Sequence, residues 1–339
     1  MPSPKIVILG TGGTIAGQAE ASTQGVGYRA GQIRVEGLIA AVPDLPQIAA
    51  GRTGATLDAV QLAQIDSKDM DWQVWRSLLQ ALAAALDDAQ IQALVVTHGT
   101  DTLEETAWLL QSVLQPRKPV VLTCAMRPAT SLQADGPQNL RDAVAVAASG
   151  VAGVWVAAAG EVHAAQQVLK AHPYRLNALR SYEGGPCAFV EEGRVRWLST
   201  PQTQQPWPAV QITQLLQRDE LPWVEVLQSG ALQSARAVQA LVAAGVQGVV
   251  VAGTGNATVH EDLLQALLQA RSQGVKVWCT TRCLEGPAVG GGDLLSGLAS
   301  IDGISAVLRP GAGANELDTV LLPPSKARVA MMLALAVCS

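Results

Sequence analysis

Short runs of apolar residues alternate along the chain with longer segments in which apolar residues recur every three or four positions. The short runs end in small or polar residues and predict buried strands at 6–9, 94–97, 120–123 and 154–158. The longer segments predict helices. The first covers 72–86, with Ser67 or Asp69 expected as its cap, and the second follows Asp135 and covers 140–148.

The second half of the chain resumes this alternation after a change of pattern. Residues 187–197 predict a hairpin that turns at Gly193, and residues 201–222 are rich in proline and glutamine, which is typical of a linker. Beyond it we expect three strands and three helices, at 224–227, 249–252 and 275–279 and near 234–244, 261–273 and 325–337.

Strands that alternate with helices in this way are typical of open α/β sheets with crossover helices. We therefore expect two α/β domains joined by the linker at 201–222. The larger, N-terminal domain covers 1–200 and has a flavodoxin-like open sheet, and the smaller, C-terminal domain covers 223–339.

Composition and charge exclude several classes of function. Apolar residues make up 49% of the 339 residues and charged residues 15%, so the chain can bury large cores and is not intrinsically disordered. The net charge is −5 and no run of Lys or Arg occurs, which argues against a nucleic-acid partner. No apolar stretch reaches the roughly 20 residues of a membrane helix. The N-terminal apolar run is too short for a signal peptide, so we expect a cytoplasmic protein.

The cysteines and histidines argue against a disulfide framework and against a metal site. The five cysteines are odd in number, none of them forms a CxxC pair, and the four histidines are scattered. We expect neither a metal nor a cofactor.

A glycine-rich loop follows the first predicted strand, with the sequence ILGTGGTIAG at 8–17. Gly10 and Gly12 fit the dinucleotide-binding pattern GxGxxG, but Ile15 stands at the third glycine position, and the GK[ST] ending of a phosphate-binding loop is absent. Threonine hydroxyls beside flexible backbone amides are instead the parts of an acyl-transfer site. The alternative is that the glycines serve only the tight packing of strands.

A second polar cluster follows the next buried strand, in LVVTHGTDTLEETAWLL at 94–110. The ends of parallel strands meet at one edge of an open sheet, where ligands bind. The structural alternative is that Thr100, Asp101 or Thr102 caps the following helix while Glu104 and Glu105 complement its dipole. The adjacent His98 is expected to be structural.

These two loops, together with AMRPATSLQADGPQNLRDAV at 125–144, closely resemble the bacterial L-asparaginases and glutaminase-asparaginases. The resemblance continues through DSKDM at 66–70, GTGN at 253–256 and PSKARVAMMLAL near the C-terminus, so it spans nearly the whole chain. It implies two α/β domains, no cofactor, and active sites between the subunits of a homodimer or homotetramer.

The resemblance also implies roles for individual residues. Thr14, the second threonine of TGGTIAG, is similar to the nucleophile that attacks the side-chain amide carbon, and Tyr28 is similar to the lid tyrosine that hydrogen-bonds it. Thr100, Asp101 and Lys170 resemble the cluster that manages the catalytic water and the protons.

Ser67 and Asp101 resemble the anchors of the substrate's α-carboxylate and α-ammonium. Lys68 stands where many members have Gln or Glu, close to the substrate ammonium, and Thr258 stands where Asn or Ser often reaches across from the neighbouring subunit. The acidic residue that the neighbouring subunit contributes in the family has no clear motif here; its candidates are Glu285, Asp293 and Glu316.

The leading hypothesis is an amidohydrolase that converts L-asparagine to L-aspartate and ammonia through a threonyl acyl-enzyme. Dual glutaminase-asparaginase activity differs only by room for one methylene, which is worth about 1–3 kcal/mol. A non-catalytic amino-acid-binding protein is the alternative from another class, but a binding protein needs no nucleophile. A nucleotide-dependent oxidoreductase is disfavoured by the missing third glycine.

Overall fold

The computed structural model describes residues 3–23, 25–51, 53–199, 209–286, 288–289, 299–301, 304–309 and 317–338. The chain divides into two compact units, residues 1–204 and 205–339. Within the described residues, no helix has the length and apolar character that crossing a lipid bilayer requires.

The first unit is built on an eight-stranded sheet with the order β10-β9-β6-β5-β4-β3-β1-β2. Five of its strands are parallel: β1 (Lys5–Gly12), β2 (Thr56–Ile65), β3 (Ile91–Thr97), β4 (Pro119–Thr123) and β5 (Gly153–Ala158). Three antiparallel strands extend the sheet beyond β5: β6 (Glu161–Ala164), β9 (Ala188–Glu191) and β10 (Arg194–Trp197). The parallel order 2-1-3-4-5 is that of flavodoxin-like folds, which confirms the predicted fold class.

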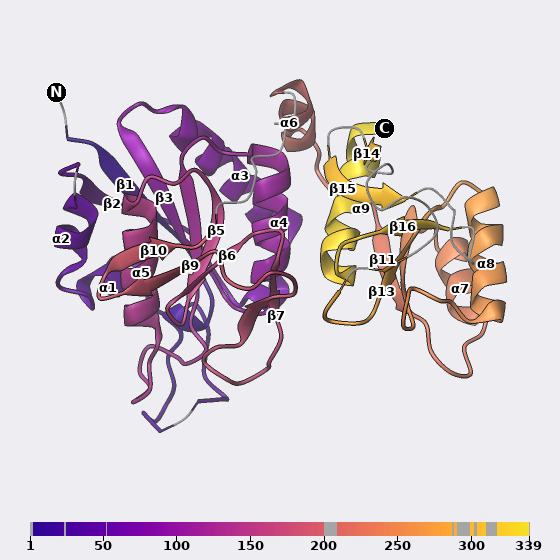
Figure 1. Cartoon of the computed structure of the whole chain (residues 1–339), viewed down its shortest axis with the longest axis horizontal. Helices are drawn as coiled ribbons and strands as arrows, with labels where there is room; N and C mark the ends of the chain where they lie inside the picture. The colour runs from indigo at the N-terminus through magenta and orange to yellow at the C-terminus, as the bar shows by residue number, and fades with distance from the viewer. Residues whose placement is uncertain are drawn as a thin grey trace. The chain divides into compact units, whose positions relative to one another are not determined.

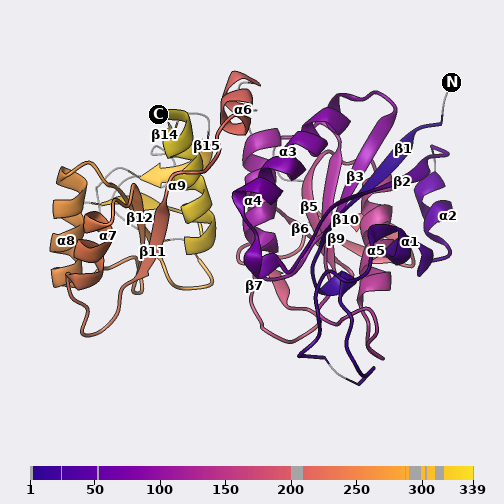
Figure 2. The same cartoon turned by 180° about the vertical axis from the view of Figure 1, so that it is seen from behind.

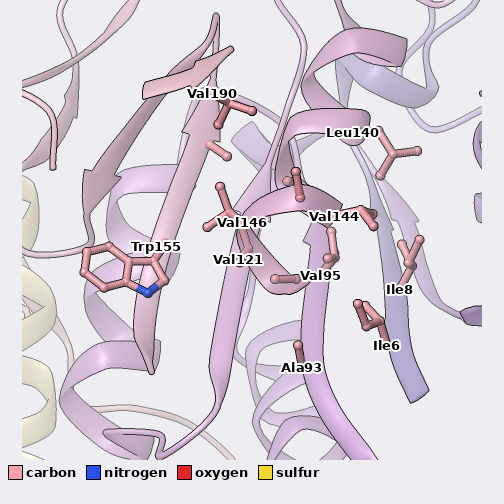
Figure 3. Close-up of a cluster of buried hydrophobic side chains, with 14 of the residues drawn as sticks. Ile6, Ile8, Ala93, Val95, Val121, Leu140, Val144, Val146, Trp155 and Val190 are labelled. Carbon is pink, nitrogen blue, oxygen red and sulfur yellow. The ribbon is translucent and has the colours of Figure 1, made fainter. Parts of the chain in front are cut away.

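Helices cover both faces of this sheet (Figure 1). One face carries α1 (Val35–Ala40), α2 (Leu45–Ala50) and α5 (Gly136–Ala148), and the other carries α3 (Trp72–Asp87) and α4 (Leu103–Leu114). Figure 3 shows the core under α5, where Leu140 and Val144 meet strand residues such as Ile8. Each such side chain contributes about 1.5–3 kcal/mol when it is fully buried, so the sheet is a rigid base for the loops at its ends.

A separate two-stranded sheet in the same unit pairs β7 (Val168–Lys170) with β8 (Leu179–Ser181). Both strands are only three residues long. Lys170 is therefore carried by a small piece of structure outside the main sheet.

The second unit contains a six-stranded sheet with the order β11-β12-β13-β16-β15-β14. Its strands are β11 (Val224–Gln228), β12 (Gly248–Gly253), β13 (Lys276–Thr281), β14 (Ala299–Ile301), β15 (Ile304–Arg309) and β16 (Asp318–Val320). Helices α7 (Arg236–Ala243) and α8 (Glu261–Ser272) lie on one side of it and α9 (Pro324–Cys338) on the other (Figure 2). The strands and helices predicted between 224 and 279, and the last helix, are present.

The stretch predicted as a linker, 201–222, includes a helix. Residues 201–208 lie outside the described residues, but α6 (Ala209–Leu216) is a helix that contacts α9. Three of the four prolines in the stretch precede this helix in the sequence, and Ile212, Leu215 and Leu216 lie within it at helical spacing. The helix was not predicted because the high proline content of the stretch indicated a linker.

Candidate active site

Two polar loops leave the carboxyl ends of β1 and β3, which are neighbours in the sheet. The chain order of the parallel strands reverses between them, and open α/β sheets bind ligands at such a switch point. Strand β1 leads into a short 3-10 helix, η1 (Thr14–Ala16), and β3 leads through residues 98–102 into α4. Figure 1 shows the indigo chain after β1 extending beyond this end of the sheet.

Glycines bring the loops after β1, β2 and β3 into backbone contact. Gly13 has a φ of 80°, which favours glycine, and a Cβ placed on it would overlap the backbone of Gly99. A Cβ on Gly99 would in turn overlap the side chain of Ser67. The glycines therefore do serve tight packing, as the structural alternative proposed. Thr14 directly follows Gly13, and Thr100 directly follows Gly99. The contact between the two glycines therefore brings the backbones of the two threonines close together.

Thr14 is buried and pairs with Tyr28, since its Oγ1 lies 2.6 Å from the Tyr28 Oη. Tyr28 lies on a segment whose two arms pair through the backbones of Gln18 and Arg29. Gly17 has no Cβ to obstruct the Tyr28 ring. Burial raises the pKa of Tyr28, and the charges of nearby carboxylates raise it further, whereas the hydrogen bond with Thr14 lowers it. Tyr28 is therefore a neutral phenol near pH 7.

Thr100 belongs to a second cluster with Lys170 and Asp101. The Lys170 Nζ donates hydrogen bonds to the Thr100 Oγ1 at 2.8 Å and to the Asp101 Oδ1 at 2.5 Å. Thr100 is buried and the Lys170 side chain is 18% exposed, whereas half of the Asp101 side chain faces solvent. The main-chain N–H of Lys170 also donates to the Glu104 Oε2 at 2.6 Å.

The two clusters adjoin each other. Asp101 is one of the carboxylates whose charge raises the pKa of Tyr28, and Gly13 and Gly99 touch beneath them. A hydroxyl held by a neutral phenol and a hydroxyl held by a lysine thus stand at the same end of the sheet. Such a pair can carry out attack on a carbonyl and proton transfer at two steps of one reaction.

Ser67 joins the second cluster through the backbone. It is buried in η2 (Ser67–Asp69), where its Oγ accepts a hydrogen bond from the Asp101 N–H at 3.2 Å. The expectation that Ser67 or Asp69 caps α3 was wrong, because Asp71 accepts the capping hydrogen bond from the Val74 N–H at 2.9 Å. Ser67 is left to line the site.

The structural alternative, in which Thr100, Asp101 or Thr102 caps α4, is realised in position but not in its hydrogen bond. Thr102 occupies the cap position of α4, but its hydroxyl donates to the Ser67 carbonyl at 2.8 Å. Thr100 and Asp101 bind Lys170 instead. The three side chains therefore make these contacts in place of a capping hydrogen bond.

His98 is fully buried, as the structural interpretation expects. Its Nδ1–H donates to the Gly99 carbonyl at 2.7 Å, and its Nε2 accepts from the Thr106 hydroxyl at 3.0 Å. Burial lowers the pKa of His98 to about 4, against the opposing effect of the Gly99 hydrogen bond. A neutral His98 therefore fixes the backbone just before Thr100.

Sequence patterns did not single out Arg127 and Tyr174, which pack against Gly25 in the segment that carries Tyr28. The Arg127 guanidinium lies 3.9 Å from the centre of the Tyr174 ring and donates to the Tyr174 carbonyl at 2.8 Å. Asp135, whose position suggested a helix cap, accepts from the N–H groups of Met126 and Arg127. Arg127 lies within the 125–144 motif, so the presence of an arginine in that motif was the available signal.

A cavity of about 320 Å³ opens beside the second cluster. Its lining includes Asp101, Lys170, Ala171, His172 and Pro173. In the parts of the chain that the structure covers, no three His, Cys, Asp or Glu side chains gather where they could hold a metal ion.

Three further predicted residues lie in the described part of the chain. The exposed Lys68 pairs its Nζ with the Asp69 carboxylate. Thr258 belongs to the second unit, where its hydroxyl lies 2.8 Å from that of Thr254, and Glu285 is exposed in the same unit. Asp293 and Glu316 lie outside the described residues.

Two family models match the chain over most of its length. The N-terminal asparaginase model matches residues 5–203, and the glutaminase/asparaginase C-terminal domain model matches residues 223–338. The chain belongs to the asparaginase family. It is therefore an amidohydrolase, an enzyme that cleaves a carboxamide with water.

Individual members of the asparaginase family are similar over most of the chain. A probable periplasmic L-asparaginase of Haemophilus influenzae is 37% identical over 282 residues, which are 82% of this chain and 78% of that protein. A glutaminase-asparaginase of Pseudomonas fluorescens biotype A is 36% identical over 80% of this chain and 74% of its own length. The crystal structure of a probable cytoplasmic L-asparaginase from Campylobacter jejuni superposes with a TM-score of 0.81 at 33% identity, covering 98% of this chain and 95% of that one.

Proposed function

We propose that this enzyme hydrolyses the side-chain amide of L-asparagine to L-aspartate and ammonia through an ester on Thr14. The observation that carries the proposal is the pair of adjoining hydroxyl clusters, Thr14 with Tyr28 and Thr100 with Lys170 and Asp101. The similarity to L-asparaginases and to a glutaminase-asparaginase supports the choice of substrate.

In the first step of the proposed reaction, the Thr14 Oγ1 attacks the amide carbon. A carbon–oxygen bond forms, the carbon–nitrogen bond breaks, and the nitrogen leaves as ammonia with the proton that Thr14 gives up. The raised pKa of Tyr28 keeps its phenol protonated. Tyr28 therefore orients Thr14 and relays a proton. The phenol passes its own proton onward as it accepts the proton of the Thr14 hydroxyl.

In the second step, water attacks the ester carbon, and the ester oxygen returns to Thr14 as a hydroxyl. Because the Lys170 Nζ already donates to the Thr100 Oγ1, the hydrogen of the Thr100 hydroxyl is directed elsewhere, toward the reacting centre. Thr100 thereby orients the water or stabilises the developing oxyanion. Lys170 and Asp101 balance the charge that develops at the reacting centre.

Substrate binding is proposed to rest on Ser67 and Asp101. The exposed half of the Asp101 carboxylate attracts an α-ammonium, and the buried Ser67 hydroxyl donates to an α-carboxylate while its oxygen accepts from the Asp101 N–H. Lys68 is proposed to lie near the α-ammonium of the substrate. The ion pair between Lys68 and Asp69 reduces the repulsion between the Lys68 side chain and that ammonium. Thr258 is proposed to contact substrate bound to a neighbouring copy.

Purified enzyme is expected to release ammonia from L-asparagine without added metal or nucleotide. L-glutamine is the second candidate substrate because a glutaminase-asparaginase is 36% identical to this chain. The two amides differ by one methylene, which can change the ratio of their kcat/KM values by roughly 10–200-fold in favour of either substrate. Steady-state ammonia release with both amides measures this ratio, and no release from either amide would overturn the proposed function.

We also propose that the enzyme works in the cytoplasm as a homodimer or homotetramer in which neighbouring copies complete each site. The similarity to a probable cytoplasmic L-asparaginase supports the location, although another relative is named periplasmic. Glu285, Asp293 and Glu316 stay the candidates for an acidic residue supplied by the neighbour.

A further inference from the structure

The β7–β8 pairing does not use the main-chain N–H of Lys170. Ala171 donates to the Ala178 carbonyl at 2.8 Å, and Tyr182 donates to the Gln167 carbonyl at 3.1 Å. In an antiparallel pair, alternate residues direct their N–H groups toward the partner strand. Lys170 lies between these positions, opposite Leu179, so its N–H points away from β8.

Glu104 occupies the position that this N–H faces. The carboxylate Oε2 accepts the Lys170 N–H at 2.6 Å, from the first turn of α4, and the Glu104 side chain is half-buried. A carboxylate that accepts a backbone N–H makes one of the stronger hydrogen bonds in proteins. The sequence pattern assigned Glu104 only to the helix dipole, so this contact is additional to that role.

The segment that supplies Glu104 also supplies the partners of the Lys170 ammonium. Thr100 and Asp101 bind the Nζ, and Glu104 binds the main-chain nitrogen of the same lysine. Three residues of the five-residue segment 100–104 thus hold Lys170 at its backbone and at its ammonium. A two-stranded sheet is marginally stable by itself, so β7 and β8 need such an anchor to keep a fixed position.

We propose that Glu104 is a positioning residue, which fixes the Lys170 backbone so that its ammonium meets Thr100 during turnover. This inference rests on the proposed function of Thr100 and Lys170. A displacement of about 1 Å at a catalytic group can cost as much as 10²-fold in rate, so losing this anchor affects the chemical step more than substrate binding.

The test compares Glu104→Leu, which removes the acceptor, with Glu104→Gln, which removes the charge but keeps an acceptor oxygen. In the full-length enzyme we expect Glu104→Leu to lower kcat for L-asparagine by about 10- to 100-fold with a smaller change in KM. Glu104→Gln is expected to stay within a few-fold of the parent enzyme. Glu105→Leu is the matched control, because Glu105 lies in the same first turn of α4 and interacts with the same helix dipole.

Parental kcat in Glu104→Leu, or an equal loss in Glu105→Leu, would overturn the positioning role. If Glu104→Leu does not fold, Glu104→Asn replaces it, because its amide is too short to reach the Lys170 N–H.

Amide hydrogen exchange of residues 168–171 reports the bond without turnover. We expect faster exchange in Glu104→Leu and Glu104→Asn, and parental exchange in Glu104→Gln. Equal exchange in all of these proteins would overturn the inference even if the parent hydrolyses neither amide, whereas an inactive parent with the expected exchange pattern would overturn only the proposed function.

Discussion

Replacing Thr14 by alanine is expected to lower kcat for L-asparagine by at least about 10³-fold while the protein stays folded. The change removes the hydroxyl proposed to attack the amide, together with one methyl group. Ammonia release under saturating substrate gives kcat, and thermal unfolding confirms the fold.

Thr11→Val is the matched control for Thr14→Ala. Thr11 is the first threonine of the same glycine-rich loop and is also buried, but its hydroxyl donates to the Thr97 carbonyl at 2.9 Å. Its loss is expected to cost about 0.5–1.5 kcal/mol of stability and little activity. A Thr14→Ala enzyme that keeps a tenth or more of the parental kcat would show that another group is the nucleophile.

Lys170→Met is expected to lower kcat by about 10²- to 10⁴-fold, the usual contribution of a group that takes part in proton transfer. Methionine keeps an unbranched apolar side chain but cannot donate to Thr100 or pair with Asp101. Lys170→Arg is expected to fail as well, because a planar guanidinium does not match the position of an ammonium.

Lys118→Met is the control for the loss of a lysine. Its ammonium donates to the Asp88 carbonyl at an exposed position in the same unit, so the variant is expected to keep parental kcat. Activity in Lys170→Met within tenfold of the parent would remove Lys170 from the reaction and leave Thr100 without its proposed partner.

Four of the five parallel strands in the first unit were predictable, because each contains a short and almost wholly apolar run. Residues 94–97 and 120–123, for example, are buried on both faces in β3 and β4. Strand β2 was not predicted: it lies at the edge of the sheet, and its sequence TLDAVQLAQI mixes polar residues with apolar ones. Strands β7 and β8 have three residues each and depend on tertiary contacts that no local pattern records.

The candidate site was predictable in its parts but not in its connections. Glycine and threonine motifs marked the ends of two strands, and the sheet order brings those ends together. The capping hydrogen bonds were not predictable, because Ser67 accepts from the Asp101 N–H and Thr102 donates to the Ser67 carbonyl, contacts that join distant parts of the chain. The contact between Glu104 and Lys170 joins residues 66 positions apart, and such a contact has no local signal.

The central claim is that Thr14 carries the acyl group, and its most direct test is to trap that group. Thr100→Ala is expected to accept the acyl group from L-asparagine more readily than it hydrolyses the ester. After an acid quench, mass spectrometry of the digested protein should find an aspartyl ester on the peptide that contains Thr14. An ester on any other residue, or turnover by Thr14→Ala at the parental rate, would contradict the account.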